Sequence, residues 1–201
     1  LGTNPMLTGT AGTAGTGASG QVATGWTASA ATGLAVTCSK VSDTAGTWQR
    51  LVVSGGATAT APGAYADATT DITPLSAVFE VPLAHASIAV GDQLRGSAEV
   101  RVAAGASGLR GVSLWVEWTT ASGTLAVASL EPDVIRSQIN LDVPSATWTG
   151  VLVTPPTPEI AETVTGARLF VAVSGAQYSG TAATISATVD IRAASAVKIQ
   201  E

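Results

Sequence analysis

From residue 34 onward, the chain alternates apolar and polar residues with a period of two. The clearest example runs over residues 94–102, where Leu, Ala and Val alternate with Arg, Ser and Glu. Such alternation is typical of a β-strand with one buried and one solvated face. The same pattern predicts further strands at 34–39, 48–53, 75–81, 112–119, 125–127, 148–153, 168–173 and 185–192.

Helical periodicity is almost absent, and only residues 158–163 have a composition that suits a helical turn. Many short strands separated by Gly- and Pro-containing turns are typical of sandwiches and barrels. We therefore predict an all-β fold, a two-sheet antiparallel jelly-roll-like β-sandwich. A polar loop from Gly55 to Thr73 is expected to interrupt the strands.

Residues 1–33 differ from the rest because they carry no charge and are rich in Gly, Thr and Ala. Their glycines are too closely spaced for a helix or a long strand. We predict an extended N-terminal arm with little regular structure, followed by the sandwich over residues 34–201. Met6, Leu7, Val22 and Trp26 would anchor this arm, which is expected to pack on other subunits.

The charge balance bears on partners and location. The net charge is −5, and the nine Lys and Arg residues are scattered, so the sequence argues against nucleic-acid binding. No apolar run is long enough for a membrane helix. The single cysteine, Cys38, cannot form an internal disulfide, which favours folding in a reducing cytoplasm, and a small buried side chain is the simplest role for it. The first residue is Leu, which indicates a processed or partial chain.

The sequence contains few of the residue combinations that enzyme catalysis requires. Nucleophilic catalysis needs a nucleophile, a base and an orienting group, yet the chain has one histidine, His85, and no Gly-x-Ser-x-Gly motif. We therefore expect no enzyme activity, neither on acyl esters nor on glycans. Glu99 and Glu117 occupy the polar faces of consecutive predicted strands. They could be a carboxylate pair, but solvated strand residues are the simpler interpretation.

A metal or cofactor is not expected either. One Cys and one His cannot form a zinc site of the usual kind. A structural calcium is the remaining alternative, because loop carbonyls and a few carboxylates can bind it. Asp133, Asp142 and Asp190 are its candidates, although their spacing matches no ligand motif.

The aromatic residues provide the candidate binding residues. Parity places Trp118, Phe79 and Trp48 in the core, and Trp148 is assigned there too. Trp115 instead shares its face with Ser113 and Glu117. Three placements fit an outward Trp115: stacking on a sugar ring beside Glu117, burial in a subunit interface, or cover by the Gly55–Thr73 loop. Tyr65 and Tyr178, in predicted loops, are weaker candidates of the same kind.

Three segments carry a resemblance to a known family: Asn4 to Thr10, Gln21 to Trp26 and Thr47 to Val52, together with the turn from Ile88 to Asp92. They resemble the carbohydrate-binding-module-like jelly roll of tailed-phage and prophage virion proteins, which often follows an SGNH (GDSL-type) hydrolase domain. The likeness covers nearly the whole chain with short motifs. It contains no hydrolase half, so no catalytic residue is carried over.

The resemblance implies a non-catalytic virion structural module of a tail fibre, tail spike or capsid surface, assembled in the host bacterial cytoplasm. Its expected partners are other virion proteins and copies of itself, with a trimer favoured, and host-surface glycan is a further expected ligand. Two alternatives remain open. One is a carbohydrate-binding module attached to a hydrolase, and the other is a capsid decoration protein that binds no glycan.

Overall fold

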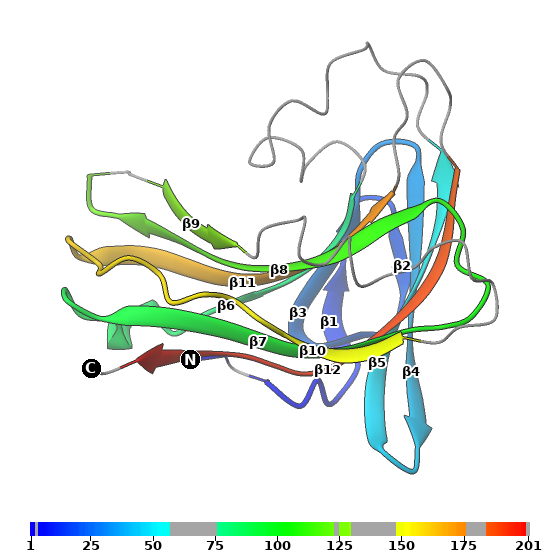
Figure 1. The fold of residues 1–201 in the computed structure, drawn as a ribbon, viewed down its shortest axis with the longest axis horizontal. Helices are drawn as coiled ribbons and strands as arrows, with labels where there is room; N and C mark the ends of the chain where they lie inside the picture. Colours follow the sequence, from blue (N-terminus) through cyan, green and yellow to red (C-terminus); the bar gives the residue numbers. More distant parts are fainter. Residues whose placement is uncertain (3, 57–75, 123–124, 130–147, 176–183, 200–201) are drawn as a thin grey trace.

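The computed structural model describes residues 1–2, 4–56, 76–122, 125–129, 148–175 and 184–199. Two six-stranded sheets pack face to face in a β-sandwich (Figure 1). Sheet 1 has the order β1-β3-β6-β11-β8-β9 and sheet 2 the order β10-β7-β12-β5-β4-β2. The strands of sheet 1 are β1 (Ala11–Ala14), β3 (Val22–Ala30), β6 (Ser76–Pro82), β11 (Val164–Gly175), β8 (Leu109–Thr120) and β9 (Leu125–Ser129). Those of sheet 2 are β10 (Trp148–Val153), β7 (Gln93–Val102), β12 (Thr184–Ile199), β5 (Gly46–Gly56), β4 (Leu34–Asp43) and β2 (Ala18–Gly20).

The predicted fold class is confirmed, and each predicted strand has a counterpart. The pairings are antiparallel except for β1 with β3 and β2 with β4, which are parallel. Within the described residues, the helical content is one 3-10 turn, His85–Ser87. The helical turn expected at 158–163 is not formed, and those residues run as irregular chain.

The hydrophobic core lies between the two sheets and follows the alternation in the sequence. In β7, every second residue is buried, from Leu94 to Val102. Trp118 and Phe79 lie in this core, as parity predicted. Phe79 stacks on Trp26, with ring centroids 4.4 Å apart and the planes 11° from parallel. Local patterning therefore decided which face of each strand turns inward.

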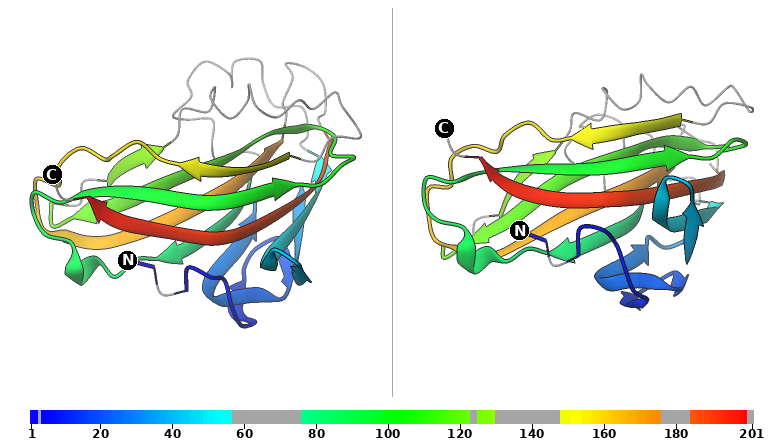
Figure 2. Two further views of the ribbon diagram at one scale, coloured as in Figure 1. Left: turned by 60° about the horizontal axis from the view of Figure 1, so that its bottom comes forward. Right: turned by 90° about the horizontal axis from the view of Figure 1, so that it is seen from below.

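The N-terminal segment corrects the prediction of an arm with little regular structure. Residues 1–33 contain three strands, and β3 lies inside sheet 1 between β1 and β6. β1 is one edge of sheet 1 and β2 is one edge of sheet 2, so the segment contributes strands to both sheets along one side of the sandwich (Figure 2). Leu7, Val22 and Trp26 are buried in the common core, whereas Met6 is exposed. Contacts of this segment with other subunits stay a prediction.

Hydrogen bonds connect the Asn4-Pro5 and Gly25-Trp26 dipeptides, which lie far apart in the sequence. The Asn4 side chain donates to the carbonyl oxygens of Thr8 and Thr24, at 2.8 and 2.9 Å. Its Oδ1 accepts from the backbone N–H of Thr8 at 3.0 Å. Trp26 Nε1 in turn donates to the Asn4 carbonyl oxygen at 3.1 Å. These hydrogen bonds therefore hold the first turn of the chain against β3, so the two dipeptides have a structural role.

Glycine in the N-terminal segment permits close approach between strands, and Gly20 gives a test. Gly20 has φ +89°, and a Cβ there would collide with the carbonyl oxygen of Cys38 on β4. Gly91 has φ +90° and open space around it. We expect Gly91→Ala to cost about 1 kcal/mol of unfolding free energy through backbone strain alone. Gly20→Ala should cost about 3 kcal/mol because overpacking adds to that strain.

Urea denaturation followed by tryptophan fluorescence measures both glycine variants on the same scale. Since the two φ angles match, the difference between the variants isolates the collision with β4. Equal losses would show that the approach of β2 to β4 is not tight.

Candidate functional site

β8 and β11 lie side by side in sheet 1 and bend, so that the outer face of this sheet is concave (Figure 1). Residues of odd number on β8 and even number on β11 point to this face, because their neighbours Leu114, Val116, Leu169 and Val171 fill the inter-sheet core. The candidate site is built from these outward residues.

Trp115 lies on the outer face, as parity predicted, and not in the inter-sheet core. It packs against Phe170 and Ala172 of β11 in a second, smaller hydrophobic cluster. The Trp115 and Phe170 rings are stacked, with centroids 4.8 Å apart and planes 5° from parallel. Each residue is only 7% exposed. The indole is therefore already buried within its own chain, so its burial needs neither of the two placements that rely on a sugar or another subunit. The third placement, cover by the Gly55–Thr73 loop, lies mostly outside the described residues.

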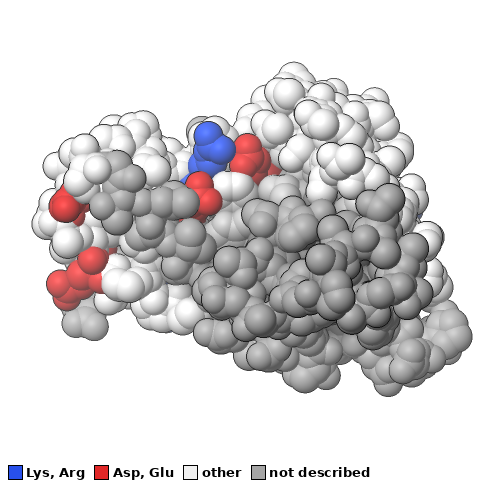
Figure 3. Space-filling view, turned by 90° about the horizontal axis from the view of Figure 1, so that it is seen from above, with Lys and Arg blue, Asp and Glu red and all other residues white. Residues whose placement is uncertain are grey.

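A row of charged side chains follows beside the aromatic pair. Arg168 of β11 lies directly opposite Glu117 of β8. Arg168 Nη1 also approaches Glu80 Oε2 of β6 at 3.5 Å, in an exposed ion pair. Seen from above, basic atoms lie beside acidic atoms on this face (Figure 3). The sequence analysis named Glu117 but missed Arg168 and Glu80, because only the order of strands in the sheet brings them together.

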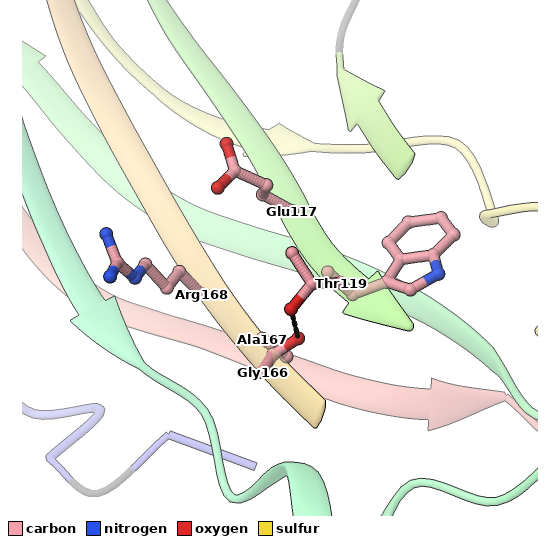
Figure 4. A pocket seen from close by; sticks show the side chains of 6 residues that line it. Glu117, Thr119, Gly166, Ala167 and Arg168 are labelled. Carbon is pink, nitrogen blue, oxygen red and sulfur yellow. Dashed lines mark hydrogen bonds between the residues drawn. The ribbon is translucent and has the colours of Figure 1, made fainter. Parts of the chain in front are cut away.

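A depression of about 180 Å³ opens beside the charged row, at the ends of β8 and β11 (Figure 4). It is lined by Glu117, Trp118, Thr119, Gly166, Ala167 and Arg168. A Cβ on Gly166 would come within 3.0 Å of Thr119 Oγ1, so glycine keeps this end of the depression open. The Thr119 hydroxyl contacts the Gly166 carbonyl oxygen at 3.5 Å.

Burial sets the electrostatics of Glu117. Loss of solvent raises the pKa of its carboxyl above the ordinary value, Arg168 opposes this shift, and the negative charge of Glu80 adds to it. A partly buried carboxylate, the guanidinium that pairs with Glu80 and a hydroxyl thus line one small space. Together they offer acceptors and donors for the hydroxyl groups of a small polar ligand.

Sheet 2 carries a different cluster on its outer face, and it corrects the placement of Trp48. Trp48 is 2% exposed but lies outside the inter-sheet core. The guanidinium carbons of Arg101 and Arg192 lie 4.4 and 4.2 Å from the centre of its ring. Its Nε1 donates to Asp43 Oδ1 at 3.1 Å. Trp48 is therefore buried by cation–π contacts on the outside of the sheet.

The charges around Trp48 neutralise one another. Asp190, only 1% exposed, accepts from Arg50 Nε at 2.7 Å and from Arg101 Nη2 at 2.7 Å. Arg192 and Glu99 form a two-bond pair at 2.7 and 2.8 Å. Arg101 also binds Asp43, and this contact does most to lower the pKa of Asp43 to about 2. Because these groups already bind each other, the cluster is a structural network.

Several residues that the sequence analysis considered for catalysis or calcium binding lie apart from the depression. Glu99 and Glu117 lie in different sheets, so they are not a carboxylate pair. Both Asp190 oxygens accept from arginines, which removes it as a calcium ligand. His85 is exposed in the 3-10 turn. The described part of the chain contains no group of three or more His, Cys, Asp or Glu placed to hold a metal ion.

Other predicted residues lie outside the described residues. These are Tyr65, Tyr178, Asp133 and Asp142, and most of the predicted Gly55–Thr73 loop. The backbone of Trp148 begins β10, but its side chain is outside the description as well. No helix in the described ranges is long and apolar enough to cross a membrane.

Comparison with solved structures establishes the fold. A carbohydrate-binding module of the β-sandwich superfamily superposes with a TM-score of 0.53 at 10% identity, over 86% of this chain. The present chain spans 57% of that chain. The enzymatically active domain of tailspike protein 4 of bacteriophage CBA120 gives 0.47 at 15% identity, over 88% of this chain and 20% of that one.

The family 11 carbohydrate-binding module of a cellulosomal cellulase of Clostridium thermocellum gives a TM-score of 0.42 at 13% identity, over 88% of this chain and 89% of that one. No protein-family model matches the sequence, and no curated protein sequence matches it. The sandwich is thus of the type found in carbohydrate-binding modules. Because the sequence identities are low, this similarity concerns the fold alone.

Proposed function

We propose that the chain is a non-catalytic module that binds glycan in the depression on the outer face of sheet 1. The observation that carries this proposal is the meeting of Glu117, Arg168 and Thr119 around one small, partly desolvated space. A sugar presents hydroxyl groups that both donate and accept, and this set complements them. The fold shared with a carbohydrate-binding module supports the assignment.

The size of the depression limits what it can hold. Its volume of about 180 Å³ is below the roughly 300–1,000 Å³ usual for drug-sized ligands. One sugar unit, such as a terminal residue or a branch, is the expected occupant. The stacked Trp115 and Phe170 rings would form the rigid floor beside it, because burial leaves them little face to offer a ligand.

The setting we propose is a phage virion, in a tail fibre, tail spike or capsid-surface protein, where such a module would attach the particle to host glycan. The support for this setting is the sequence resemblance of the Asn-Pro, Gly-Trp and Ile88–Asp92 segments. Binding rather than turnover is the proposed activity, because the polar side chains that line the depression suit hydrogen bonding to hydroxyl groups.

Glycan binding is tested by a glycan array followed by calorimetry, with Glu117→Gln as the principal variant. The substitution keeps the shape of the side chain and removes the charge-assisted acceptor, so we expect a loss of affinity of about tenfold or more. Arg168→Ala should weaken binding to a similar degree. Glu159→Gln, the same chemical change at an exposed loop position, should bind as the wild type does.

Two results would contradict the proposal. One is an array without any bound glycan at millimolar sensitivity, and the other is a glycan whose affinity is unchanged in Glu117→Gln and Arg168→Ala. Thermal melting of each variant separates a lost contact from a lost fold.

A further inference from the structure

β10 is an edge strand with a free side among the described residues. It pairs with β7 over six consecutive positions, from Trp148 opposite Val102 to Val153 opposite Ser97, without a break in register. In the sheet order no other strand lies beyond it. Such an edge presents backbone N–H and C=O groups that can pair with another strand.

The edges formed by β1 and β2 are less suited to pairing, because β1 has four residues and a break in its register with β3 and β2 has only three residues. The remaining edge strand, β9, is similar in character but one residue shorter than β10. β10 has six residues, none of them charged and none of them proline. Pro155 and Pro156 follow one residue after its end, so pairing would be confined to β10 and Thr154.

The side chains of β10 also leave apolar surface uncovered. Leu152 points into the core and is 4% exposed, whereas Val151 and Val153 point outward and are 65% and 43% exposed. Native edge strands commonly carry a charge, a proline or a bulge that prevents pairing, and the described β10 carries none of these. These valines and the outer backbone groups of β10 are available to a partner strand.

We propose that two copies of this chain pair antiparallel through β10, about a two-fold axis at Val151. Antiparallel pairing with the axis at this residue places Val151 opposite its symmetry mate and Val153 opposite Thr149, all on the same face. These cross-strand pairs would cover the exposed valines, and the two copies of sheet 2 would form one continuous sheet.

Charge favours a second copy as the occupant. The chain carries −5 overall, so most approaches of one copy to another meet like charge. β10 itself is uncharged, and the nearest charges on β7, Glu99 and Arg101, are neutralised within their own chain by Arg192 and Asp190. An isologous contact here therefore brings no unpaired like charges together.

Disulfide trapping with Val151→Cys tests the pairing directly. At the proposed axis, the two introduced thiols lie opposite each other, within the range of a disulfide. The native Cys38 does not compete, because it is 2% exposed and burial raises its pKa to about 11. Val90→Cys is the matched control, since Val90 is 60% exposed in a turn away from β10.

We expect most of the Val151→Cys protein to become a linked dimer under mild oxidation and the Val90→Cys protein to stay unlinked. Sedimentation equilibrium of the wild type should show a monomer–dimer exchange. Val151→Lys should raise its dissociation constant about tenfold or more, because it places like charges opposite each other. Val90→Lys should leave it unchanged.

A wild type that is monomeric at the highest attainable concentration would overturn the proposal. So would a trimer, since an isologous edge contact closes with two copies. Equal linkage of both cysteine variants would overturn it as well, by showing random collision. The proposed pairing is independent of the glycan site, because β10 belongs to the other sheet, and either can fail alone.

Discussion

Replacing Asp190 by Asn is expected to lower the free energy of unfolding by about 2–3 kcal/mol. Asp190 is nearly fully buried and accepts hydrogen bonds from both Arg50 and Arg101. Removing one partner of a buried ion pair typically costs about 3–5 kcal/mol, because a charge is left uncompensated. The arginine side chains are 31% and 25% exposed, so water screens part of this loss.

The measurement is urea denaturation of Asp190→Asn, with Glu159→Gln as the control for a carboxylate that is exposed. The double variant with Arg50→Met should lose less than the sum of the two single variants, because the first change already breaks their shared contact. A loss of unfolding free energy within about 0.5 kcal/mol of the control would mean that the ion-pair network contributes little to stability.

Replacing Gln49 by Leu is expected to cost about 3 kcal/mol and to loosen the N-terminal segment selectively. Gln49 is fully buried among apolar residues of the core. Its Oε1 accepts from the Ala23 backbone N–H at 2.9 Å, and its Nε2 donates to the Gln21 and Ser39 carbonyl oxygens at 3.0 and 3.1 Å. Leucine would leave these backbone groups without partners, each at a cost of about 1–3 kcal/mol.

Hydrogen exchange gives a readout that an ordinary cavity would not produce. The amide of Ala23 should exchange faster in Gln49→Leu than in the wild type, while the amides of β7 keep their protection. Gln93→Leu, at a partly exposed position on the outer face of sheet 2, should change neither stability nor exchange at Ala23. Unchanged exchange at Ala23 would show that the buried amide does not fasten this segment.

Alternation along the sequence was sufficient to predict the strands from residue 34 onward and the face that most of their residues occupy, with Trp48 as an exception. This succeeds because successive side chains of a strand point to opposite sides, whatever lies beside the strand. Trp115 shows both the strength and the limit of that reasoning. Its outward direction was correct, but its burial against Phe170 depends on β11 lying next to β8.

The N-terminal strands escaped prediction because their inward residues are small. In β3, Trp26, Ala28 and Ala30 face the core, and alanine contributes little hydrophobic contrast against Thr27 and Ser29. The glycines that suggested a loop instead let the backbones of neighbouring strands approach closely, as Gly20 does against Cys38. Composition alone does not distinguish a glycine in a flexible loop from a glycine that lets two strands pack closely.

The sequence by itself thus determined the fold class, most strands and the orientation of their side chains, and it singled out Trp115 and Glu117. Only the tertiary structure decided that Arg168 and Glu80 join Glu117, and that Arg50 meets Asp190 across 140 residues of chain. The reason is physical: side-chain direction follows from local backbone geometry, whereas the order of strands depends on packing summed over both whole sheets.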